Sequence, residues 1–386
     1  MDYDEDAIRA QAERVASLTG VSPECMFEVA NALQGMGLTA NYIPMSRERF
    51  EALTLEELRT PIAKGGIRLC KYYSDVDISG KKVNYSRQGL FEQTVHLSHP
   101  KVFNDPFDCV PKVDKESIRN ALVSDIASCL GIKLSPEDDR WCLMRKIVKV
   151  LNTPDANRPR LATPLHSLQC INLQWLCLSL AFEAKKRNGL TPGIVAEIVE
   201  DRVQNTLDNV GQCRIACFGR SPHNLYMWAH YANDHTGFCL EYETDPNMLK
   251  ARRFDEASLK LLHRNMFNVF YCPDRPDATD EVTAFMRSRL DEEGLARFYA
   301  KILCFKSPDW TFEQELRLIV QDANMPDELP FLPARRVYLG TRMDDAKAEC
   351  LVEYCREHGV EAVRMVPSAE RFALEEHVLV PSIYGV

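Results

Sequence analysis

Long blocks with helical periodicity alternate with blocks of strand periodicity, and this arrangement restricts the fold more than any other feature. Between about residues 114 and 211, apolar side chains such as Ile118, Leu122 and Ile126 recur at the spacing of a helix. Ile67–Tyr73, before this block, alternates as a strand does. Doubly wound sheets need regular strand–helix alternation, which is absent here. We predict an α+β fold with a mixed, largely antiparallel sheet and a helical insertion at about 114–211.

The beginning of the chain is predicted to be a small helical appendage. Thr54 and Glu57 have the spacing of a capping box, in which each side chain bonds the other's backbone at the start of a helix. Gly65 lies in a Lys-Gly-Gly sequence that interrupts the helical pattern. The predicted domains are therefore residues 1–65, the appendage, and residues 66–386, the α+β domain.

Other local patterns predict the remaining elements. Gln93–Ser98 is predicted to be a strand that pairs with Ile67–Tyr73. A helix is predicted from Asp344 to His358 and is closed by Gly359. The other predicted strands are Phe238–Tyr242, Asn268–Cys272, Ile302–Lys306, Phe312–Val320, Arg336–Leu339 and Val360–Val366.

Composition and charge indicate the compartment and the kinds of partner. The fractions of 45% hydrophobic and 27% charged residues are ordinary for a soluble globular protein. A net charge of -9 disfavours non-specific binding to nucleic acid or anionic membranes. Met1–Asp6 is acidic, unlike a secretory signal, and apolar runs are too short to span a bilayer. The 14 scattered cysteines suggest reduced thiols, so we expect a cytoplasmic protein without membrane association.

The segment His223–His235 contains the densest set of chemically able side chains, with three His among them. A helix is predicted here. Leu225, Trp228, Ala229 and Ala232 follow the spacing of one helical face, which we expect to be buried.

Two polar pairs on this helix indicate a candidate binding surface. His230 and Asp234 are four residues apart, as are Tyr231 and His235, so each pair is predicted to lie together. One interpretation is that these side chains line a cleft and contact a ligand. The other is that they bond neighbouring backbone groups and cap the helix. We expect His230, Tyr231 and Asp234 to form one wall of a shared pocket.

Phe103–Asp108 is the second candidate stretch. Pro106 restricts Asp105 to an extended conformation, and Asn104 and Asp108 have side chains that close turns. The segment is predicted to be a structural turn. The alternative is that Asn104, Asp105 or Asp108 faces a pocket.

The third candidate stretch contains two carboxylates and a guanidinium. In a strand over Phe312–Val320, the side chains of Glu313, Glu315 and Arg317 share one face. This face is either solvated or a site. In a site, Arg317 keeps one acid ionised while crowding raises the proton affinity of the other.

Several common catalytic motifs are missing from the sequence. It contains no Gly-x-x-x-x-Gly-Lys-Ser/Thr, Gly-x-Gly-x-x-Gly, Gly-x-Ser-x-Gly or His-Glu-x-x-His. This argues against P-loop nucleotidases, Rossmann dehydrogenases, the usual serine hydrolases and zincins. Neither of the close cysteine pairings has a second pair nearby, so no metal is predicted.

Five stretches, in order, resemble the bacterial family called domain of unknown function 2971. The similarity spans roughly residues 66–365. The stretches are Lys71-Tyr72, Phe103–Asp108, Trp228–Ala232 with Gly237-Phe238, Phe312–Arg317 and Val337–Gly340.

A more distant similarity connects the chain with ADP-ribosyltransferase-like folds. Such folds have three characteristic positions: a residue on the first strand, a Ser or Thr on the second strand, and Glu/Gln-x-Glu on a late strand. In this chain they would be Lys71 or Tyr72, then Ser98, then Glu313-Gln-Glu315. The first position has Lys or Tyr where Arg or His is usual, unless Arg68 serves there, and the second is His-Leu-Ser where Ser-Thr-Ser is usual. The resemblance implies NAD as the substrate, with ADP-ribosyl transfer or NAD glycohydrolysis as the reaction.

On this resemblance, Glu315 stabilises an oxocarbenium-like transition state, Glu313 orients the acceptor, and Arg317 completes the catalytic group. Tyr72 or Tyr231 would stack on nicotinamide, and Ser98 would support the ribose. The full set of predicted binding residues is Lys71, Tyr72, Ser98, Asn104, Asp105, His230, Tyr231 and Asp234.

Two alternatives of different classes stay open. One is a metal-dependent hydrolase or nuclease that uses Asp105, Asp108, His230 and Glu241. The other is a non-catalytic ligand-sensing or partner-binding protein, for instance in a bacterial defence or toxin system. Expected partners are a small-molecule nucleotide and a macromolecular acceptor.

Overall fold

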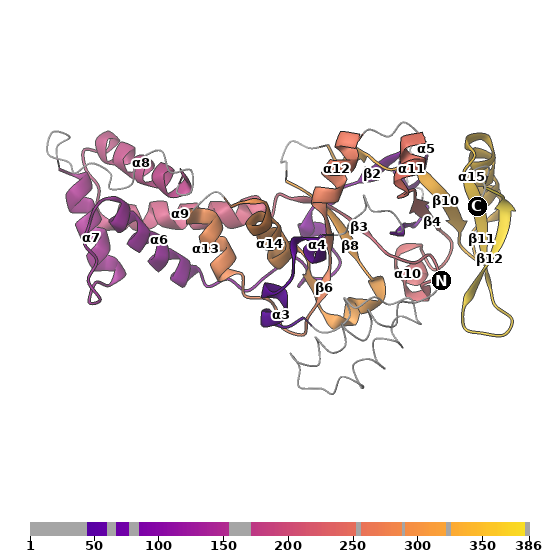
Figure 1. Ribbon diagram of the computed structural model, residues 1–386, viewed down its shortest axis with the longest axis horizontal. Helices are drawn as coiled ribbons and strands as arrows, with labels where there is room; N and C mark the ends of the chain where they lie inside the picture. The colour runs from indigo at the N-terminus through magenta and orange to yellow at the C-terminus, as the bar shows by residue number, and fades with distance from the viewer. Residues whose placement is uncertain are drawn as a thin grey trace. The chain divides into compact units, whose positions relative to one another are not determined.

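The computed structural model describes residues 45–59, 67–76, 85–153, 171–251, 256–287, 290–321 and 326–382. Helices and mixed, mostly antiparallel sheets confirm the predicted α+β class (Figure 1). The chain divides into two compact units. The first unit comprises Met1–Phe107, Arg214–Asp274 and Lys306–Val386, and the second comprises Asp108–Cys213 and Arg275–Phe305.

A five-stranded sheet is the main element of the first unit. Its order is β1 (Leu69–Tyr73), β4 (Phe238–Tyr242), β10 (Ala334–Leu339), β11 (Glu361–Pro367) and β12 (Leu374–Val380). Strands β10 and β11 are parallel, and the other neighbours are antiparallel. The mixed pairing follows from the connection between β10 and β11, which is a helix and not a hairpin.

That connecting helix, α15 (Asp345–His358), confirms the helix predicted from the sequence. The Asp344 side chain accepts hydrogen bonds from two backbone amides of the first turn. Gly359 ends the helix in the left-handed region, with φ of 67°. A residue with a Cβ adopts this conformation at a cost, which explains the glycine. The helix lies against the β10–β12 part of the sheet (Figure 1).

A three-stranded antiparallel sheet in the order β3 (Arg214–Phe218), β8 (Leu316–Val320) and β5 (Met266–Asn268) completes the core of the first unit. Apolar side chains of both sheets belong to one buried cluster. Cys70 and Gly219 exchange backbone hydrogen bonds of 2.9 and 2.7 Å, which fixes the start of β1 beside the end of β3.

The predicted pairing of the first two strands is wrong. Strand β2 (Thr94–His96) pairs with β9 (Glu328–Pro330), whereas β1 pairs with β4. Alternation of apolar residues identifies a strand but does not specify its neighbour, because many strands offer equivalent backbone groups.

Part of the predicted N-terminal appendage is described, and it packs within the first unit. Its helices are α3 (Arg47–Glu51) and α4 (Leu55–Leu58), and the capping box of Thr54 and Glu57 is present. The Met45 backbone N–H donates to the Tyr271 carbonyl at 3.0 Å. Residues 1–44 and 60–65 of the predicted appendage lie outside the described residues. The division at residue 65 stays a prediction.

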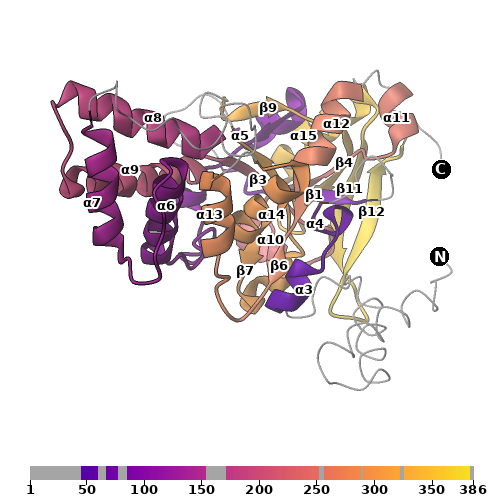
Figure 2. The ribbon, with the colours of Figure 1, turned by 60° about the vertical axis from the view of Figure 1, so that its left-hand side comes forward.

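The described second unit is helical (Figure 2). The described residues of the segment predicted as a helical insertion form four helices, and two helices from a later segment belong to the same unit. The helices are α6 (Lys115–Cys129), α7 (Arg140–Leu151), α8 (Ile171–Lys186), α9 (Pro192–Val210), α13 (Thr279–Arg287) and α14 (Glu292–Leu303). The strand predicted at Ile302–Lys306 is wrong in its first half, because α14 continues through Leu303 and β7 is only Phe305–Lys306.

Short elements complete the first unit. They are α5 (Tyr85–Phe91), η3 (Pro100–Val102), α10 (Leu225–Tyr231), α11 (Pro246–Ala251), α12 (Glu256–Asn265), β6 (Phe270–Tyr271) and η6 (Pro308–Glu313). Across the described parts of the chain, every helix is too short or too polar to cross a membrane.

Candidate functional site

The Glu313-Gln-Glu315 stretch is a turn between two elements, and the strand predicted over it is wrong at its beginning. The 3-10 helix η6 (Pro308–Glu313) ends at Gln314, which has a left-handed φ of 49°, and β8 begins only at Leu316. Pro308 favours the helix because its ring fixes φ, and the Ser307 side chain caps it. Glu313 and Glu315 are therefore not alternate residues of one strand.

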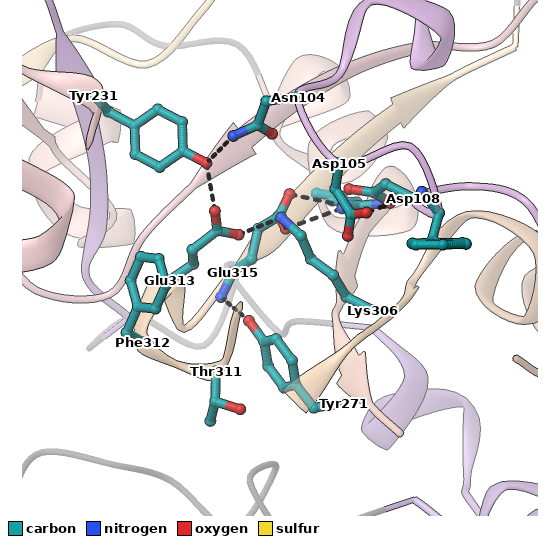
Figure 3. Close-up of polar contacts among 12 residues, drawn as sticks. Asn104, Asp105, Asp108, Tyr231, Tyr271, Lys306, Thr311, Phe312, Glu313 and Glu315 are labelled. Carbon is teal, nitrogen blue, oxygen red and sulfur yellow. Dashed lines mark hydrogen bonds and ion pairs between the residues drawn. The ribbon is translucent and has the colours of Figure 1, made fainter. Parts of the chain in front are cut away.

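The turn nevertheless directs both carboxylates toward one lysine. Lys306 Nζ donates to Glu313 Oε2 at 2.5 Å and to Glu315 Oε2 at 3.3 Å (Figure 3). All three side chains are buried. The same ammonium lies 4.6 Å from the centre of the Trp310 ring, within the range of a cation–π interaction.

Arg317 holds Glu315 from the other side. Its Nε and one terminal nitrogen donate to the two Glu315 carboxylate oxygens at 2.8 and 2.9 Å. This bidentate geometry is the strongest form of the pair. The guanidinium is completely buried and lies 5.4 Å from the Phe103 ring. The Glu315 backbone N–H donates to Tyr271 Oη at 3.0 Å, so both ends of the residue are fixed.

Glu313 has a different second partner. Tyr231 Oη donates to Glu313 Oε1 and accepts from Asn104 Nδ2 at 3.2 Å (Figure 3). Three sequence-predicted residues from distant parts of the chain thus form one hydrogen-bonded series. Because Tyr231 is only half-buried and Asn104 is exposed, this series connects Glu313 with the protein surface.

The two glutamates have opposite proton affinities. Burial raises the pKa of Glu313 to about 7, and the neighbouring charge of Glu315 adds to this effect, while Lys306 and Tyr231 oppose it. Burial also disfavours ionised Glu315, but Arg317 and Lys306 overcome that cost and hold its pKa well below the usual range. Near neutral pH, Glu315 is therefore a fixed negative charge and Glu313 exchanges a proton.

Of the two predicted residues on β1, only Lys71 faces this group. Lys71 Nζ donates to the Cys217 carbonyl at 3.2 Å. Burial lowers its pKa, while the thiol of Cys217 and the carboxylate of Glu315 act in the opposite direction. Cys217 lies opposite Arg317 in the pairing of β3 with β8. Lys71 is therefore a third cation in the field of Glu315.

Tyr72 points to the opposite face of the strand, as alternation requires. Its hydroxyl donates to the Ser221 carbonyl at 2.6 Å, and its ring packs edge-on against Trp228 at 5.2 Å. Ser98 exchanges backbone hydrogen bonds with Ile215. The structure therefore does not bring Tyr72 to the glutamates with Lys71, and it shows Ser98 in a structural bridge.

Helix α10 is shorter than predicted, and its buried face is different. Met227, Trp228 and Ala232 are buried against the sheet, whereas Leu225 is 40% exposed and Ala229 is exposed. The predicted face was wrong at Leu225 and Ala229. The physical reason is that the helix spans only seven residues, of which Met227 and Trp228 in its middle are the buried ones.

The predicted pairing of His230 with Asp234 is also wrong, because the helix ends at Tyr231. Asn233, Asp234 and His235 all have left-handed φ values, so Asp234 lies in a turn with its side chain exposed. The His235 ring stacks on Trp228, with the ring centres 6.1 Å apart. His230 remains near the site through a different contact, described next.

Four aromatic side chains form a partly exposed surface next to Glu313. We call Tyr226, His230, Trp310 and Phe312 the aromatic patch. The Phe312 ring is at its centre, with the other three ring centres 5.3, 5.7 and 5.9 Å away. Tyr226 is 64% exposed. Phe312 precedes Glu313 in the chain and Trp310 contacts Lys306, so the patch adjoins the charged group directly.

Described contacts of the residues proposed for a metal site are with other protein groups. Glu241 accepts from Tyr338 Oη at 2.6 Å and lies 3.5 Å from Arg68, whereas His230 stacks on Phe312. Asp108 belongs to the second unit, where Cys109 Sγ donates to it at 3.4 Å. Within the described segments, no group of three or more His, Cys, Asp or Glu is arranged to hold a metal ion.

The sequence interpretation missed Lys306, Tyr271 and Cys217. Lys306 was placed at the end of a predicted strand, where it looked like an ordinary polar residue. Its importance depends on a contact with Glu313 and Glu315 across a turn whose geometry the sequence does not reveal. A lysine close in sequence to two glutamates was the available signal.

Comparison with known proteins confirms the family predicted from the sequence. The family described as Protein of unknown function (DUF2971) matches residues 227–318 of the chain. The matched range contains Tyr231, Lys306, Glu313, Glu315 and Arg317. No curated protein and no solved structure matches the chain. The similarity to ADP-ribosyltransferase-like folds stays a prediction.

Proposed function

We propose that the first unit is an enzyme that cleaves the bond between nicotinamide and ribose in NAD and transfers the ADP-ribosyl group to water or to an acceptor. The observation that carries this proposal is the pair of neighbouring glutamates with opposite pKa shifts. Pairs of this kind are typical of sites that divide acid–base and electrostatic roles between two carboxylates.

Glu315 supplies the fixed charge in this mechanism. When the glycosidic bond breaks, its electrons leave with the nicotinamide nitrogen and positive charge develops on the ribose. A carboxylate held by Arg317 and Lys306 does not reorganise during this step, so its field favours the transition state.

Glu313 handles the proton. Water or the acceptor adds to the ribose carbon and passes its proton to Glu313, which is partly ionised near pH 7. Tyr231 and Asn104 connect this carboxylate with the surface and provide a route by which the proton leaves.

The aromatic patch supports a planar substrate group. Exposed aromatic rings bind nucleobases and similar rings by stacking. Tyr72 is unsuited to the stacking role expected for it, because its ring packs against Trp228. Tyr226, His230 and Phe312 take that role in the proposed complex.

The test is incubation of the purified protein with NAD labelled in the nicotinamide ring, with released nicotinamide measured by chromatography over pH 5–9. Glu315→Gln is expected to reduce release by about 10²- to 10³-fold, as does loss of one preorganised electrostatic contact. The matched control is Glu361→Gln, which removes a buried carboxylate paired with Arg336 at 2.7 Å elsewhere in the unit. Release by the wild type no faster than without protein, with or without added acceptor proteins, would refute the proposal.

A second candidate is a protein that binds a nucleotide without turning it over. The supporting observation is that both Glu315 carboxylate oxygens are already bonded by Arg317 and Lys306 within the protein. This arrangement also serves to position a rigid binding surface. Saturable binding of NAD without nicotinamide release would favour this alternative.

A further inference from the structure

Asp105 has one carboxylate oxygen without a hydrogen-bond donor. Its Oδ1 accepts from the Phe107 backbone N–H at 2.9 Å, which closes the turn predicted from the sequence. Its Oδ2 is buried and has no partner among the described residues, and the side chain is 5% exposed. A buried acceptor that is left unpaired is costly, so a donor from a bound molecule would be favoured there.

The position of Asp105 connects it with the candidate site. The two residues before it both touch the site: Phe103 lies under Arg317, and Asn104 bonds Tyr231. Figure 3 shows the Asp105 carboxylate in the same group as Lys306 and Glu315. Asn104, Pro106 and Phe107 are exposed, so the carboxylate lies directly beneath a surface turn.

The local charges indicate what kind of donor fits. Three cations and three carboxylates meet in this region, and one carboxylate, Glu313, is partly protonated near neutral pH. These groups are Lys71, Lys306, Arg317, Asp105, Glu313 and Glu315. These charges largely balance one another, so the group that donates to Asp105 need not itself carry a charge. A neutral NH₂ group on a planar ring satisfies the Asp105 oxygen and suits the aromatic patch.

We propose that Asp105 determines specificity by accepting a hydrogen bond from the carboxamide NH₂ of the nicotinamide group. This inference rests on the proposed function. It assigns to Asp105 the distinction between nicotinamide and rings of the same shape that lack the carboxamide NH₂ donor. The Asp105 backbone turn holds the side chain in place, so the acceptor is preorganised before the ligand arrives.

The experiment compares the affinities of NAD and its 3-acetylpyridine analogue, which replaces the NH₂ group by a methyl group. Isothermal titration of the wild type is expected to give binding of NAD about tenfold or more tighter than of the analogue. In Asp105→Asn, the amide retains the bond to Phe107 and presents a donor in place of Oδ2, so the preference is expected to disappear or reverse. Asp309→Asn, an exposed aspartate in η6, is the control and should keep the wild-type preference.

Equal affinities of the wild type for both compounds, or binding of neither, would overturn the inference. The comparison within the wild type decides this even if Asp105→Asn fails to fold. Nicotinamide release without discrimination would leave the proposed function standing and reject the role of Asp105. Tighter binding of NAD than of the analogue, without any nicotinamide release, would support the role of Asp105 and reject the proposed function.

Discussion

The pKa of Glu313 makes a quantitative prediction about stability. In the folded protein, the pKa of the Glu313 carboxyl is raised from its ordinary value of 4.5 to about 7. Between these pH values the folded state binds more protons at this residue than the unfolded state does, so its contribution to stability decreases as pH rises. A rise of the pKa from 4.5 to about 7, at about 1.4 kcal/mol per pH unit, lowers the free energy of unfolding by about 3 kcal/mol as the pH increases through this range.

Glu313→Gln removes this titration while it keeps the size of the side chain and an acceptor for Tyr231. The variant is therefore expected to gain about 3 kcal/mol relative to the wild type on going from pH 4.5 to pH 8. The measurement is urea unfolding of both proteins at several pH values, followed by the change in their free-energy difference. Direct titration of the Glu313 carboxyl carbon by NMR gives its pKa in the folded protein without assuming two-state unfolding.

Glu361→Gln serves as the control for general effects of pH. Glu361 pairs with Arg336 outside the candidate site, so it should not reproduce the relative gain. A free-energy difference between Glu313→Gln and the wild type that stays constant from pH 4.5 to 8 would refute the reasoning. So would an NMR midpoint near 4.5.

Three further predictions concern the same structure. Lys306→Met leaves two buried carboxylates without their shared cation and should lower the free energy of unfolding, measured in urea, by about 3–5 kcal/mol. The exposed Lys133 is the control: Lys133→Met should change it little, and equal effects would contradict the prediction. Tyr231→Phe removes a hydrogen bond that favours ionised Glu313, so the NMR midpoint of Glu313 should rise above 7; a lower midpoint would show that the bond does not act in this way. Gly359→Ala forces a Cβ into a left-handed cap and should lower stability by about 1 kcal/mol, measured as a lower thermal midpoint; an unchanged midpoint would contradict it.

Features with local causes were predictable from the sequence. The ends of α15 depend on Asp344 and Gly359, and the start of α4 depends on Thr54 and Glu57, so each follows from residues close in the chain. Strand positions were also largely predictable. The pairing of β2 with β9 was not, because it joins segments more than two hundred residues apart.

The candidate site was only partly predictable for the same reason. The sequence indicated Glu313, Glu315 and Arg317, but it placed them on one strand. The left-handed conformation of Gln314 breaks that strand. A left-handed conformation is not predictable from a glutamine, because non-glycine residues rarely adopt it. Lys306 could be recognised only once this turn showed which side chains it brings together.

Burying the charged side chains of Lys306, Glu315 and Arg317 costs free energy of desolvation, which argues that they have a role other than stabilising the fold. Replacing a buried ion network by apolar residues of similar volume is often neutral or stabilising, so packing alone does not require Lys306, Glu315 and Arg317. Their arrangement instead keeps Glu315 ionised and allows Glu313, in the same surroundings, to titrate near neutral pH. A variant with Lys306, Glu315 and Arg317 replaced together by Met, Leu and Met tests this separation. It should stay folded at pH 6, because Glu313 is then largely protonated and Lys71 keeps its bond to the Cys217 carbonyl, while nicotinamide release is lost.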